Sequence, residues 1–406
     1  MAKDWDIVVY GATGFTGRQT AAYLADRAPA DLRLAVAGRS QQRLEALRDG
    51  LDRPGVGVVV ADSTDPASVD AMAASARVVV TTAGPFALYG TPVVAACVRH
   101  GTHYCDITGE TPWVRDMIDA HHDSAAASGT RIVPLCGFDS VPSDLGAFAL
   151  VQHVREAHGQ ETRRIKAWYR LRGGLNGGTL ASALNLNASG EVRRLAKPFL
   201  LSPGHAPDED ERAESRDPRE VIKDPHWGWC APYFMAAINT RVVRRSASLL
   251  AAAGEGYGAS FTYQEYMGSG GGASRLKATR DAMVAGTLMG LMSRPWSRAL
   301  VERVGPKPGQ GPRQSTIDGG GFRADLLAET ASGDLVWGTV TGQGDPSNTI
   351  TITCLAESAL CLAVDEASLP PIGGVLTPAV AFGQHLLDRL DGTCVRVAVG
   401  VPRGQR

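Results

Sequence analysis

The stretch Ile7-Val8-Val9-Tyr10-Gly11-Ala12-Thr13-Gly14-Phe15-Thr16-Gly17 decides the fold of the first part of this chain. Its apolar beginning is a predicted strand, which runs into glycines spaced G-x-x-G-x-x-G and then into a predicted helix over 18–27. We expect Gly11 to permit a tight turn, Gly14 to let backbone approach a ligand, and Gly17 to let the helix pack closely on the strand. Strand, glycine turn and helix start together favour a dinucleotide pyrophosphate site, since the N–H groups of a helix start attract negative charge. A tight connection without a ligand is the alternative.

The end of the second predicted strand, 32–37, narrows the choice of cofactor. A site that prefers NAD usually carries an acidic residue near this point, which binds the ribose 2′-hydroxyl. Here the chain has Arg39 and Ser40. A guanidinium suits a 2′-phosphate through charge-assisted hydrogen bonds, and a neighbouring hydroxyl can donate one more. We therefore predict NADPH as the cofactor, the alternative being that Arg39 is a solvated arginine at the start of a helix over 41–48.

Strands and helices continue to alternate as far as residue 143. Predicted strands over 56–61, 77–82, 103–106 and 131–135 with helices between them indicate a doubly wound parallel sheet with right-handed crossovers. The Asp62 carboxylate after the third strand either reaches the adenine amino group or caps the next helix. Ligands lie at the carboxyl ends of such strands, so we expect the corner after the fourth strand beside the nicotinamide. The predicted cofactor-binding residues are Gly11, Thr13, Gly14, Phe15, Thr16, Gly17, Arg39, Ser40, Asp62, Ser63, Ala83, Gly84 and Pro85.

The pattern changes after residue 143. A strand over 163–172 places Ile165, Ala167, Tyr169 and Leu171 on one face, and further strands are predicted over 259–267, 322–330, 335–341 and 348–354. Strands in succession with helices packed on one face suggest an antiparallel α+β domain. We therefore predict an α/β protein with a Rossmann-type domain over 1–143 and an inserted α+β substrate or oligomerisation domain over 144–370. A helix and a strand over 371–406 are expected to return to the first domain.

Composition excludes several classes of function. The net charge of 406 residues is −1, and no basic stripe suggests a nucleic-acid partner. Seven scattered cysteines and nine histidines show no ligand spacing, so we predict no metal and buried, reduced thiols. The first strand begins almost at once, which leaves no room for a signal peptide, and we expect a cytoplasmic protein. The apolar helix over 282–292 is too short to span a bilayer; it is either an interfacial helix or, as we expect, a core helix.

Several pieces of the chain, in this order, resemble one family. They are Gly11-Ala12-Thr13-Gly14-Phe15-Thr16-Gly17, Ala37-Gly38-Arg39-Ser40, Ala83-Gly84-Pro85-Phe86 with Tyr89-Gly90, Tyr104-Cys105-Asp106 with Thr108-Gly109-Glu110, Gly137-Phe138-Asp139-Ser140-Val141-Pro142, Arg244-Arg245-Ser246 and Gly344-Asp345-Pro346. The set is similar to the saccharopine dehydrogenase-like oxidoreductases, and within them to the mycobacterial trans-acting enoyl reductases of polyketide lipid assembly. The resemblance implies a Rossmann domain with an inserted α+β domain, and NADPH-dependent reduction between them. It implies as substrate an α,β-unsaturated acyl thioester on a synthase or other carrier.

Reduction of an enoyl thioester requires hydrogen-bond donors for the developing enolate oxygen and a proton for Cα. Tyr89, which follows the Gly84-Pro85 corner, is the leading candidate donor, and the alternative is a tyrosine that packs a loop onto the cofactor. Asp139 and Ser140 follow the sixth strand and either orient substrate or cap the next helix. A general-acid role for Asp139 requires a pKa raised by burial. The predicted catalytic residues are therefore Tyr89, Asp139 and Ser140.

Two other functions stay open from the sequence. The first is an NADPH reductase of an imine or ketone, for which Arg241, Arg244 and Arg245 are the cluster that could bind substrate carboxylates; a solvated face is the alternative for these arginines. The second is a nucleotide-binding, lipid-associated protein without turnover. Homo-oligomers and peripheral membrane contact are compatible with the sequence, and a transmembrane segment is not expected.

Overall fold

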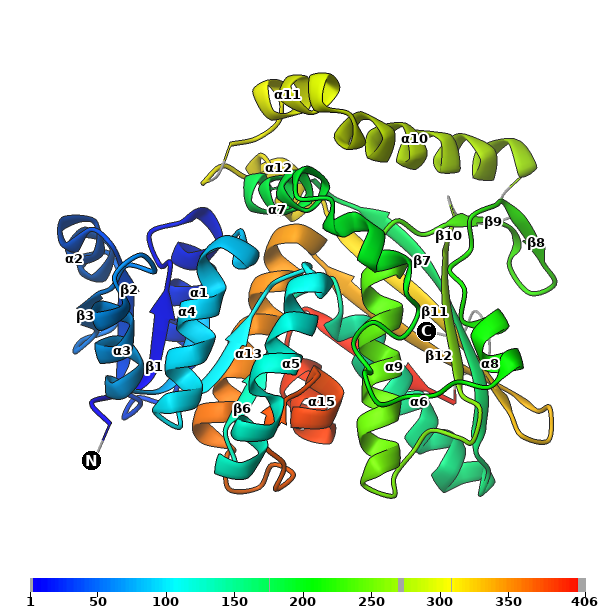
Figure 1. Ribbon diagram of the computed structural model, residues 1–406, viewed down its shortest axis with the longest axis horizontal. Coiled ribbons are helices and arrows are strands. Elements are labelled where there is room, and N and C mark those ends of the chain that lie inside the picture. Colours follow the sequence, from blue (N-terminus) through cyan, green and yellow to red (C-terminus); the bar gives the residue numbers. More distant parts are fainter. Residues whose placement is uncertain (1–2, 175, 269–273, 308, 401–406) are drawn as a thin grey trace.

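The computed structural model describes residues 3–174, 176–268, 274–307 and 309–400. Two sheets of seven strands each dominate these residues, with helices around and between them (Figure 1). The first sheet lies in the N-terminal part of the chain and the second is built mainly from residues 162–343. The predicted α/β fold class is therefore confirmed.

The first sheet is parallel throughout and has the strand order β13-β6-β5-β4-β1-β2-β3. The middle residues of β1, β2 and β4 are apolar and buried because helices cover both faces of the sheet. The order reverses between β1 and β4, and this is the point at which doubly wound sheets bind ligands. The strands are β1 (Trp5–Tyr10), β2 (Leu34–Gly38), β3 (Gly57–Val60), β4 (Ala76–Thr81), β5 (His103–Asp106), β6 (Arg131–Val133) and β13 (Gly374–Val375).

Alternate residues of β1 belong to the two layers that flank the first sheet. Ile7 and Val9 lie in one core cluster together with residues of α1 and α13, whereas Val8 and Tyr10 lie in a second cluster with residues of α3, α4 and α5. Helix α2 packs beside β2 and β3. These helices are α1 (Phe15–Arg27), α2 (Gln41–Asp49), α3 (Pro66–Ser75), α4 (Phe86–Arg99), α5 (Thr111–Ser128) and α13 (Thr351–Val364).

The second sheet has the order β14-β12-β11-β7-β10-β9-β8. It is mixed and not antiparallel throughout as we expected, because β7 and β10 run parallel while its other pairs are antiparallel. The long connection between β7 and β10, which contains helices, allows this parallel pairing. Helices α6 (Val141–His158) and α9 (Ala236–Ala252) cover one face. The predicted alternation in β7 is confirmed, since Ile165, Ala167 and Tyr169 enter the large core and Trp168 lies in a separate cluster. The strands are β7 (Thr162–Arg172), β8 (Ile222–Asp224), β9 (Gly228–Pro232), β10 (Thr262–Met267), β11 (Gly321–Thr330), β12 (Leu335–Gln343) and β14 (Val395–Val399).

Two expectations for the C-terminal part are wrong. Residues 348–354 form no strand; a π-helical turn over Pro346–Ile350 leads into α13, whose apolar residues pack on the first sheet. The chain does return to the first sheet, through β13, but its last strand, β14, pairs with β12 at the edge of the second sheet. Apolar β-branched residues suit a buried helix as well as a strand, so the local pattern did not separate the two.

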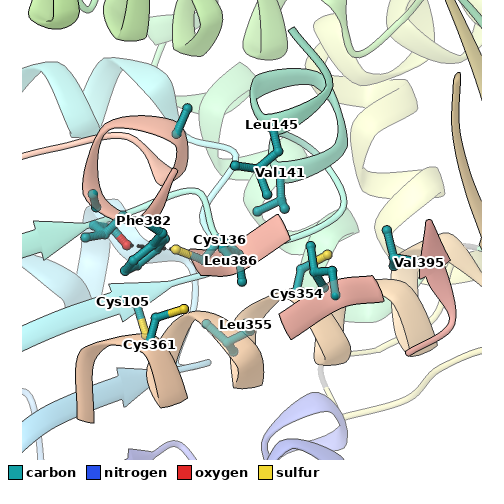
Figure 2. Close-up of a cluster of buried hydrophobic side chains, with 14 of the residues drawn as sticks. Cys105, Cys136, Val141, Leu145, Cys354, Leu355, Cys361, Phe382, Leu386 and Val395 are labelled. Carbon is teal, nitrogen blue, oxygen red and sulfur yellow. Dashed lines mark hydrogen bonds between the residues drawn. The ribbon is translucent and has the colours of Figure 1, made fainter. Parts of the chain in front are cut away.

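Among the described residues, one helical segment is long and apolar enough to cross a membrane. It consists of α13 and the turn before it. Residues buried inside the protein make up 83% of this apolar window. Figure 2 shows the surrounding core, in which Cys354, Leu355 and Cys361 of α13 lie near Cys105, Cys136 and Phe382. The apolarity of α13 is thus explained by its position between the first sheet and the C-terminal helices. All seven cysteines are free, and six of them are buried.

Helices α10 (Arg275–Ser293) and α11 (Pro295–Val304) form an arm at the top of Figure 1. The sequence predicts a long helix over 274–303 that is broken near Pro295, and the break is confirmed. Helix α10 is not the core helix that we expected, since Met283 and Val284 are exposed. The remaining helical elements are α7 (Gly177–Ala188), η1 (Glu191–Ala196), α8 (Glu209–Glu214), α12 (Gln314–Asp318), α14 (Pro378–Phe382) and α15 (Gln384–Asp391).

Candidate active site

The glycine turn after β1 holds strand and helix in close contact. Gly11 has a φ of +79°, a conformation that favours glycine. A Cβ atom on Gly17 would lie 2.3 Å from the Gly11 carbonyl oxygen and 2.8 Å from Thr82 Oγ1. A side chain at position 17 would therefore push α1 off the strand. The conformational reasons predicted for these two glycines are confirmed.

The N-terminus of α1 is open to an anion. Gly14 is its N-cap residue, and no side chain accepts a hydrogen bond from the first turn. The N–H groups of the residues that follow, Phe15, Thr16 and Gly17, therefore remain for a ligand. The Thr13 carbonyl oxygen, just before the N-cap, accepts a hydrogen bond from Arg43 Nη2 at 3.4 Å.

Arg39 and Ser40 lie at the carboxyl end of β2, next to the glycine turn in the sheet. Arg39 is exposed, and Ser40 is the N-cap residue of α2 but makes no side-chain capping bond. The guanidinium of Arg39 and the hydroxyl of Ser40 are thus both available to bind a phosphate. Arg43, one helical turn further along, is also exposed and was missed by the sequence analysis. Its spacing of four residues from Arg39 was the signal that could have found it.

Asp62 does not cap a helix. Its carboxylate accepts hydrogen bonds from Thr64 N and Oγ1, both at 2.9 Å, whereas Asp65 is the residue that caps α3. These bonds lower the pKa of Asp62. Ser63 N donates to Tyr10 Oη at 3.0 Å. Asp62 and Ser63 therefore form a polar turn at the end of β3, and their predicted contact with the adenine half stays a prediction.

The corner after β4 lies against the glycine turn. A Cβ atom on Gly11 would lie 3.1 Å from both the Ala83 N and Cβ atoms, so the two loops touch. Pro85 is the N-cap residue of α4. Tyr89 lies in the first turn of this helix and is 38% exposed, so it is not a core residue. The contact of this corner with a nicotinamide stays a prediction.

Glu110 occupies the N-terminus of α4, a role that the sequence analysis missed. Its carboxylate accepts hydrogen bonds from Phe86 N at 2.8 Å and Ala87 N at 3.0 Å. Ser182 Oγ of α7 donates to the same carboxylate at 2.7 Å. A buried carboxylate therefore satisfies this helix start, whereas no side chain caps the start of α1. The bond from Ser182 ties α7 to the corner that carries Pro85.

A groove of about 300 Å³ lies beside this corner, between α4, α5 and α7. Its lining is mixed, with apolar side chains on several walls and Glu110 at one end. The lining includes Ala87, Thr91, Glu110, Trp113, Asn185 and Leu186.

Asp139 is presented by the loop that follows β6. Asp106 holds this loop, since its Oδ1 atom accepts hydrogen bonds from Thr108 N and from Leu135 N. Leu135 has a φ of +66°, which is rare for a residue with a branched side chain. The Asp106 contact therefore fixes a strained turn four residues before Asp139.

The Asp139 carboxyl is half-buried and has no hydrogen-bond partner among the described residues. Burial raises its pKa to about 6. The Cβ position of Gly109 lies 3.5 Å from Asp139 Oδ2 and 3.3 Å from Ile238 Cδ1. Since Gly109 precedes Glu110, this carboxyl lies close to the corner after β4. The structure supplies the raised pKa that a general acid at this position requires.

Ser140 and Tyr233 are buried neighbours of this loop with unpaired hydroxyl groups. Ser140 stands at the N-cap position of α6, but its hydroxyl makes no capping bond and has no partner among the described residues. Tyr233 Oη is likewise buried and has no hydrogen-bond partner among the described residues, and its ring stacks on that of Tyr169 at 4.6 Å. Burial and nearby acids, Asp139 among them, raise the pKa of Tyr233. Sequence reasoning missed Tyr233.

Arg241, Arg244 and Arg245 are neither a substrate site nor a solvated face. All three are buried in α9. Arg241 donates to the Leu195 carbonyl oxygen, Arg244 to Pro198 O at 3.0 Å and Arg245 to Leu201 O at 2.5 Å. Together they hold the segment 195–201 against α9. The sequence could not show this, because the acceptors are backbone carbonyls distant in the chain.

The loop after α11 closes on the glycine turn. A Cβ atom on Gly311 would lie 2.1 Å from the ring of Phe15, and one on Gly177 would lie 2.0 Å from the Lys307 carbonyl oxygen. Gly177 N also donates to Gln310 O at 3.0 Å. The glycines at the start of α7 therefore allow its backbone to pack closely on the loop after α11. Helix α7 lies between the arm and the edge of the first sheet that carries the glycine turn.

The residues present fit an NADP(H) dinucleotide. Three features lie after the carboxyl ends of the adjacent strands β1 and β2. They are Gly17, where there is no room for a side chain, the uncapped N-terminus of α1, and the hydroxyl of Ser40. Arg39 adds the positive charge that a 2′-phosphate requires. Among the residues that the structure describes, no group of three or more His, Cys, Asp or Glu side chains could hold a metal ion.

Residues 7–133 match the family model of the saccharopine dehydrogenase NADP binding domain, which confirms the predicted class of cofactor. A Mycobacterium tuberculosis protein named trans-acting enoyl reductase is 38% identical over 415 residues, which is 97% of each chain. A Mycobacterium ulcerans protein of the same name is 38% identical over 419 residues, or 98% of each chain. Another M. tuberculosis relative, provisionally given that name, is 42% identical over 97% of each chain.

Two solved structures share the fold over nearly the whole chain. Saccharopine dehydrogenase from Saccharomyces cerevisiae matches with a TM-score of 0.50 and 15% identity, covering 98% of this chain and 100% of its own. A homospermidine synthase from Legionella pneumophila, solved in complex with NAD, matches with a TM-score of 0.53 and 10% identity, covering 99% of this chain and 93% of its own. At these identities the likeness concerns the fold alone.

Proposed function

Because the chain belongs to the saccharopine dehydrogenase-like family of trans-acting enoyl reductases, we propose that it reduces the C=C bond of an enoyl thioester with NADPH. The substrate is an acyl intermediate of polyketide or lipid assembly, held on a carrier protein or synthase. The observation that carries the chemical part of the proposal is the Asp139 carboxyl, unpartnered among the described residues, beside the corner after β4.

Asp139 supplies the proton in this proposal. NADPH, when bound, supplies the hydride that Cβ of the substrate accepts. Negative charge then builds on the thioester oxygen, and Cα requires a proton to complete the reduction. A carboxyl group with a pKa of about 6 keeps a useful protonated fraction near neutral pH, which an ordinary aspartic acid does not. Asp106 acts as a positioning residue, since it holds the loop that carries Asp139.

Tyr89 is the proposed hydrogen-bond donor to the thioester oxygen. It lies one turn into α4, and the start of that helix is fixed by the bonds of Glu110 to Phe86 N and Ala87 N. A donor on a fixed helix start stabilises developing charge without reorganising. In the proposal the groove between α4, α5 and α7 holds the acyl chain, because it opens beside the same corner and is partly apolar.

Reduction of an imine or ketone is the second candidate, because the yeast saccharopine dehydrogenase shares the fold. An amino-acid substrate with several carboxylates needs cationic side chains in the site. The arginines of α9 that could serve are bound to backbone carbonyls of the segment 195–201. This observation favours an acyl chain as the substrate.

Calorimetric titration with NADPH and NADH, followed by turnover of a carrier-linked enoyl thioester, tests the proposal. We expect tighter binding of NADPH and oxidation of NADPH that depends on the enoyl substrate. The Tyr89→Phe variant should bind NADPH as the wild type does and lose turnover. Turnover with imines or ketones and none with enoyl thioesters would replace the proposed function by the second candidate.

A further inference from the structure

The outer face of the α10–α11 arm is the most apolar exposed surface among the described residues. Of the thirteen large hydrophobic side chains that are exposed in that part of the chain, seven lie within the arm, and they are between 36% and 81% exposed. They are Leu276, Met283, Val284, Leu291, Trp296, Leu300 and Val304. Of the seven tryptophans, Trp296 alone is exposed. Such a concentration indicates an interaction surface.

The exposed side chains follow helical spacing. Leu276 and Met283 are seven residues apart on α10, as are Val284 and Leu291, so each pair lies on nearly the same line along the helix. On α11, Trp296, Leu300 and Val304 follow one another at intervals of four. On α11 these residues form one apolar stripe, whereas on α10 the two pairs form two apolar lines with Arg280 between them.

The opposite side of the arm packs on the protein. Helix α10 contacts β9 and α7, and α11 contacts α7. Ala278, Met292 and Ser297 are buried on this inner side. Arg275 lies over the ring of Trp229 at 5.4 Å and fixes the beginning of the arm. The exposed stripes thus belong to helices that are already packed, and they are not the uncovered core of an unfinished domain.

The arm is basic in a chain of nearly zero net charge. Residues 275–304 carry six basic and two acidic side chains, a net charge of +4, whereas the whole chain has −1. Lys277, Arg280, Arg294 and Arg303 are exposed. By helical spacing Arg280, which forms an ion pair with Asp281 at 2.9 Å, lies between the two apolar lines of α10. Arg303 follows Trp296 by seven residues and lies beside the apolar stripe of α11.

We propose that the outer face of the α10–α11 arm docks on a bilayer surface that contains anionic lipids. Apolar side chains with an exposed tryptophan and flanking cations are the composition of helices that lie in a membrane interface. The two helices span about 40 Å at 1.5 Å per residue, and a narrow apolar strip of that length fits a planar surface. A two-fold contact with a second copy of the chain would bring two arms of charge +4 together. Their repulsion disfavours a second copy as the partner of this surface.

The position of the arm connects this surface to the candidate active site. Helix α7 packs under both arm helices, and its Ser182 bonds to Glu110 beside Pro85. The loop after α11 touches Phe15 of the glycine turn through Gly311. Docking of the arm would therefore bring the groove between α4, α5 and α7 near the membrane, where an acyl substrate with a long chain partitions.

Flotation with vesicles tests the proposal. The full chain should float with vesicles of phosphatidylcholine and phosphatidylglycerol, and binding should weaken at high salt and on phosphatidylcholine alone. Lipids with brominated chains should quench part of the tryptophan fluorescence, because Trp296 enters the interface. The Trp296→Ser/Leu300→Ser variant should lose both signals, and Lys277→Glu/Arg303→Glu should lose the preference for anionic vesicles.

The Leu335→Ser variant is the matched control, since this residue is exposed to a similar degree in the β11–β12 hairpin; it should bind vesicles as the wild type does. Thermal unfolding should be the same for all variants, because the substituted side chains are exposed. Absence of binding to anionic vesicles overturns the proposal, as does unchanged binding of the Trp296→Ser/Leu300→Ser variant. A dimer that this double substitution dissociates would assign the surface to a second copy. Binding requires no turnover, so the result is independent of the proposed enzymatic function.

Discussion

Arg39 is the side chain that we expect to set the preference for NADPH over NADH. It lies exposed at the end of β2, beside Ser40, whose hydroxyl makes no capping bond, and one helical turn before Arg43. A 2′-phosphate bound there adds charge-assisted hydrogen bonds that NADH cannot make.

The Arg39→Ala variant should bind NADPH more weakly by one to two orders of magnitude, since such a bond contributes roughly 1.5–3 kcal/mol. Binding of NADH should change little. Titration calorimetry measures both affinities. Arg48→Ala, at a partly exposed arginine near the other end of α2, is the control and should leave both affinities unchanged. An equal loss for both cofactors would exclude the contact with the 2′-phosphate.

Asp139 is the residue on which the proposed chemistry depends. The Asp139→Asn variant should reduce enoyl turnover by roughly 10²–10⁴-fold, because the amide cannot donate the proton, while its affinity for NADPH stays near the wild-type value. In the wild type, kcat should fall as pH rises through an apparent pKa near 6. Asp52→Asn, at an exposed site, serves as control. A wild-type rate in the Asn variant would remove Asp139 from the reaction.

At the scale of elements, the start of α4 is fixed by a side chain from another loop. Glu110 accepts bonds from two backbone N–H groups of α4 and from Ser182 of α7. One carboxylate thereby joins the loop after β4, the loop after β5 and α7.

Glu110→Gln should lower the free energy of unfolding by about 1–3 kcal/mol, because the amide retains one acceptor oxygen and leaves a buried N–H group unpaired. Urea unfolding measures the change. Glu156→Gln, at an exposed site of α6, should have almost no effect and is the control. If the two variants are equally stable, Glu110 is not the cap on which α4 depends.

For the whole molecule, buried carboxyl groups determine how stability depends on pH. Burial raises the pKa of Asp106, Asp144 and Glu265 to about 7 and that of Asp139 to about 6. The folded state therefore holds more protons than the unfolded state between about pH 4 and 7. The stability that these groups contribute is fully present below their unfolded pKa and is lost as pH rises through the folded values.

The free energy of unfolding should accordingly be lower at pH 8 than at pH 5 by several kcal/mol. His121 and His122, whose pKa values burial lowers, act in the opposite direction below about pH 6.5 and offset part of the slope. Below pH 4 the trend reverses, since salt bridges hold the pKa of Asp6 and Glu366 at about 2. Urea unfolding at constant ionic strength measures this profile. A constant or rising free energy between pH 5 and 8 would contradict it.

By itself, the sequence determined the parts whose cause is local. The Gly11-to-Gly17 turn, the strands of the first sheet, the alternation in β7 and the break at Pro295 each follow from neighbouring residues, through backbone freedom, periodicity or a missing N–H group. The motifs of the family also identified the cofactor class correctly.

Only the tertiary structure decided what depends on residues distant in the chain. The buried arginines of α9 bind carbonyls of 195–201, Glu110 caps α4, and β14 joins the second sheet. The pKa of Asp139 is raised because packed elements exclude water from it, and the apolar residues of α10 are exposed because α7 and β9 cover only its inner side. Whether a side chain is buried, and which group it bonds to, depends on how whole helices and strands pack. A local sequence pattern contains no information about either.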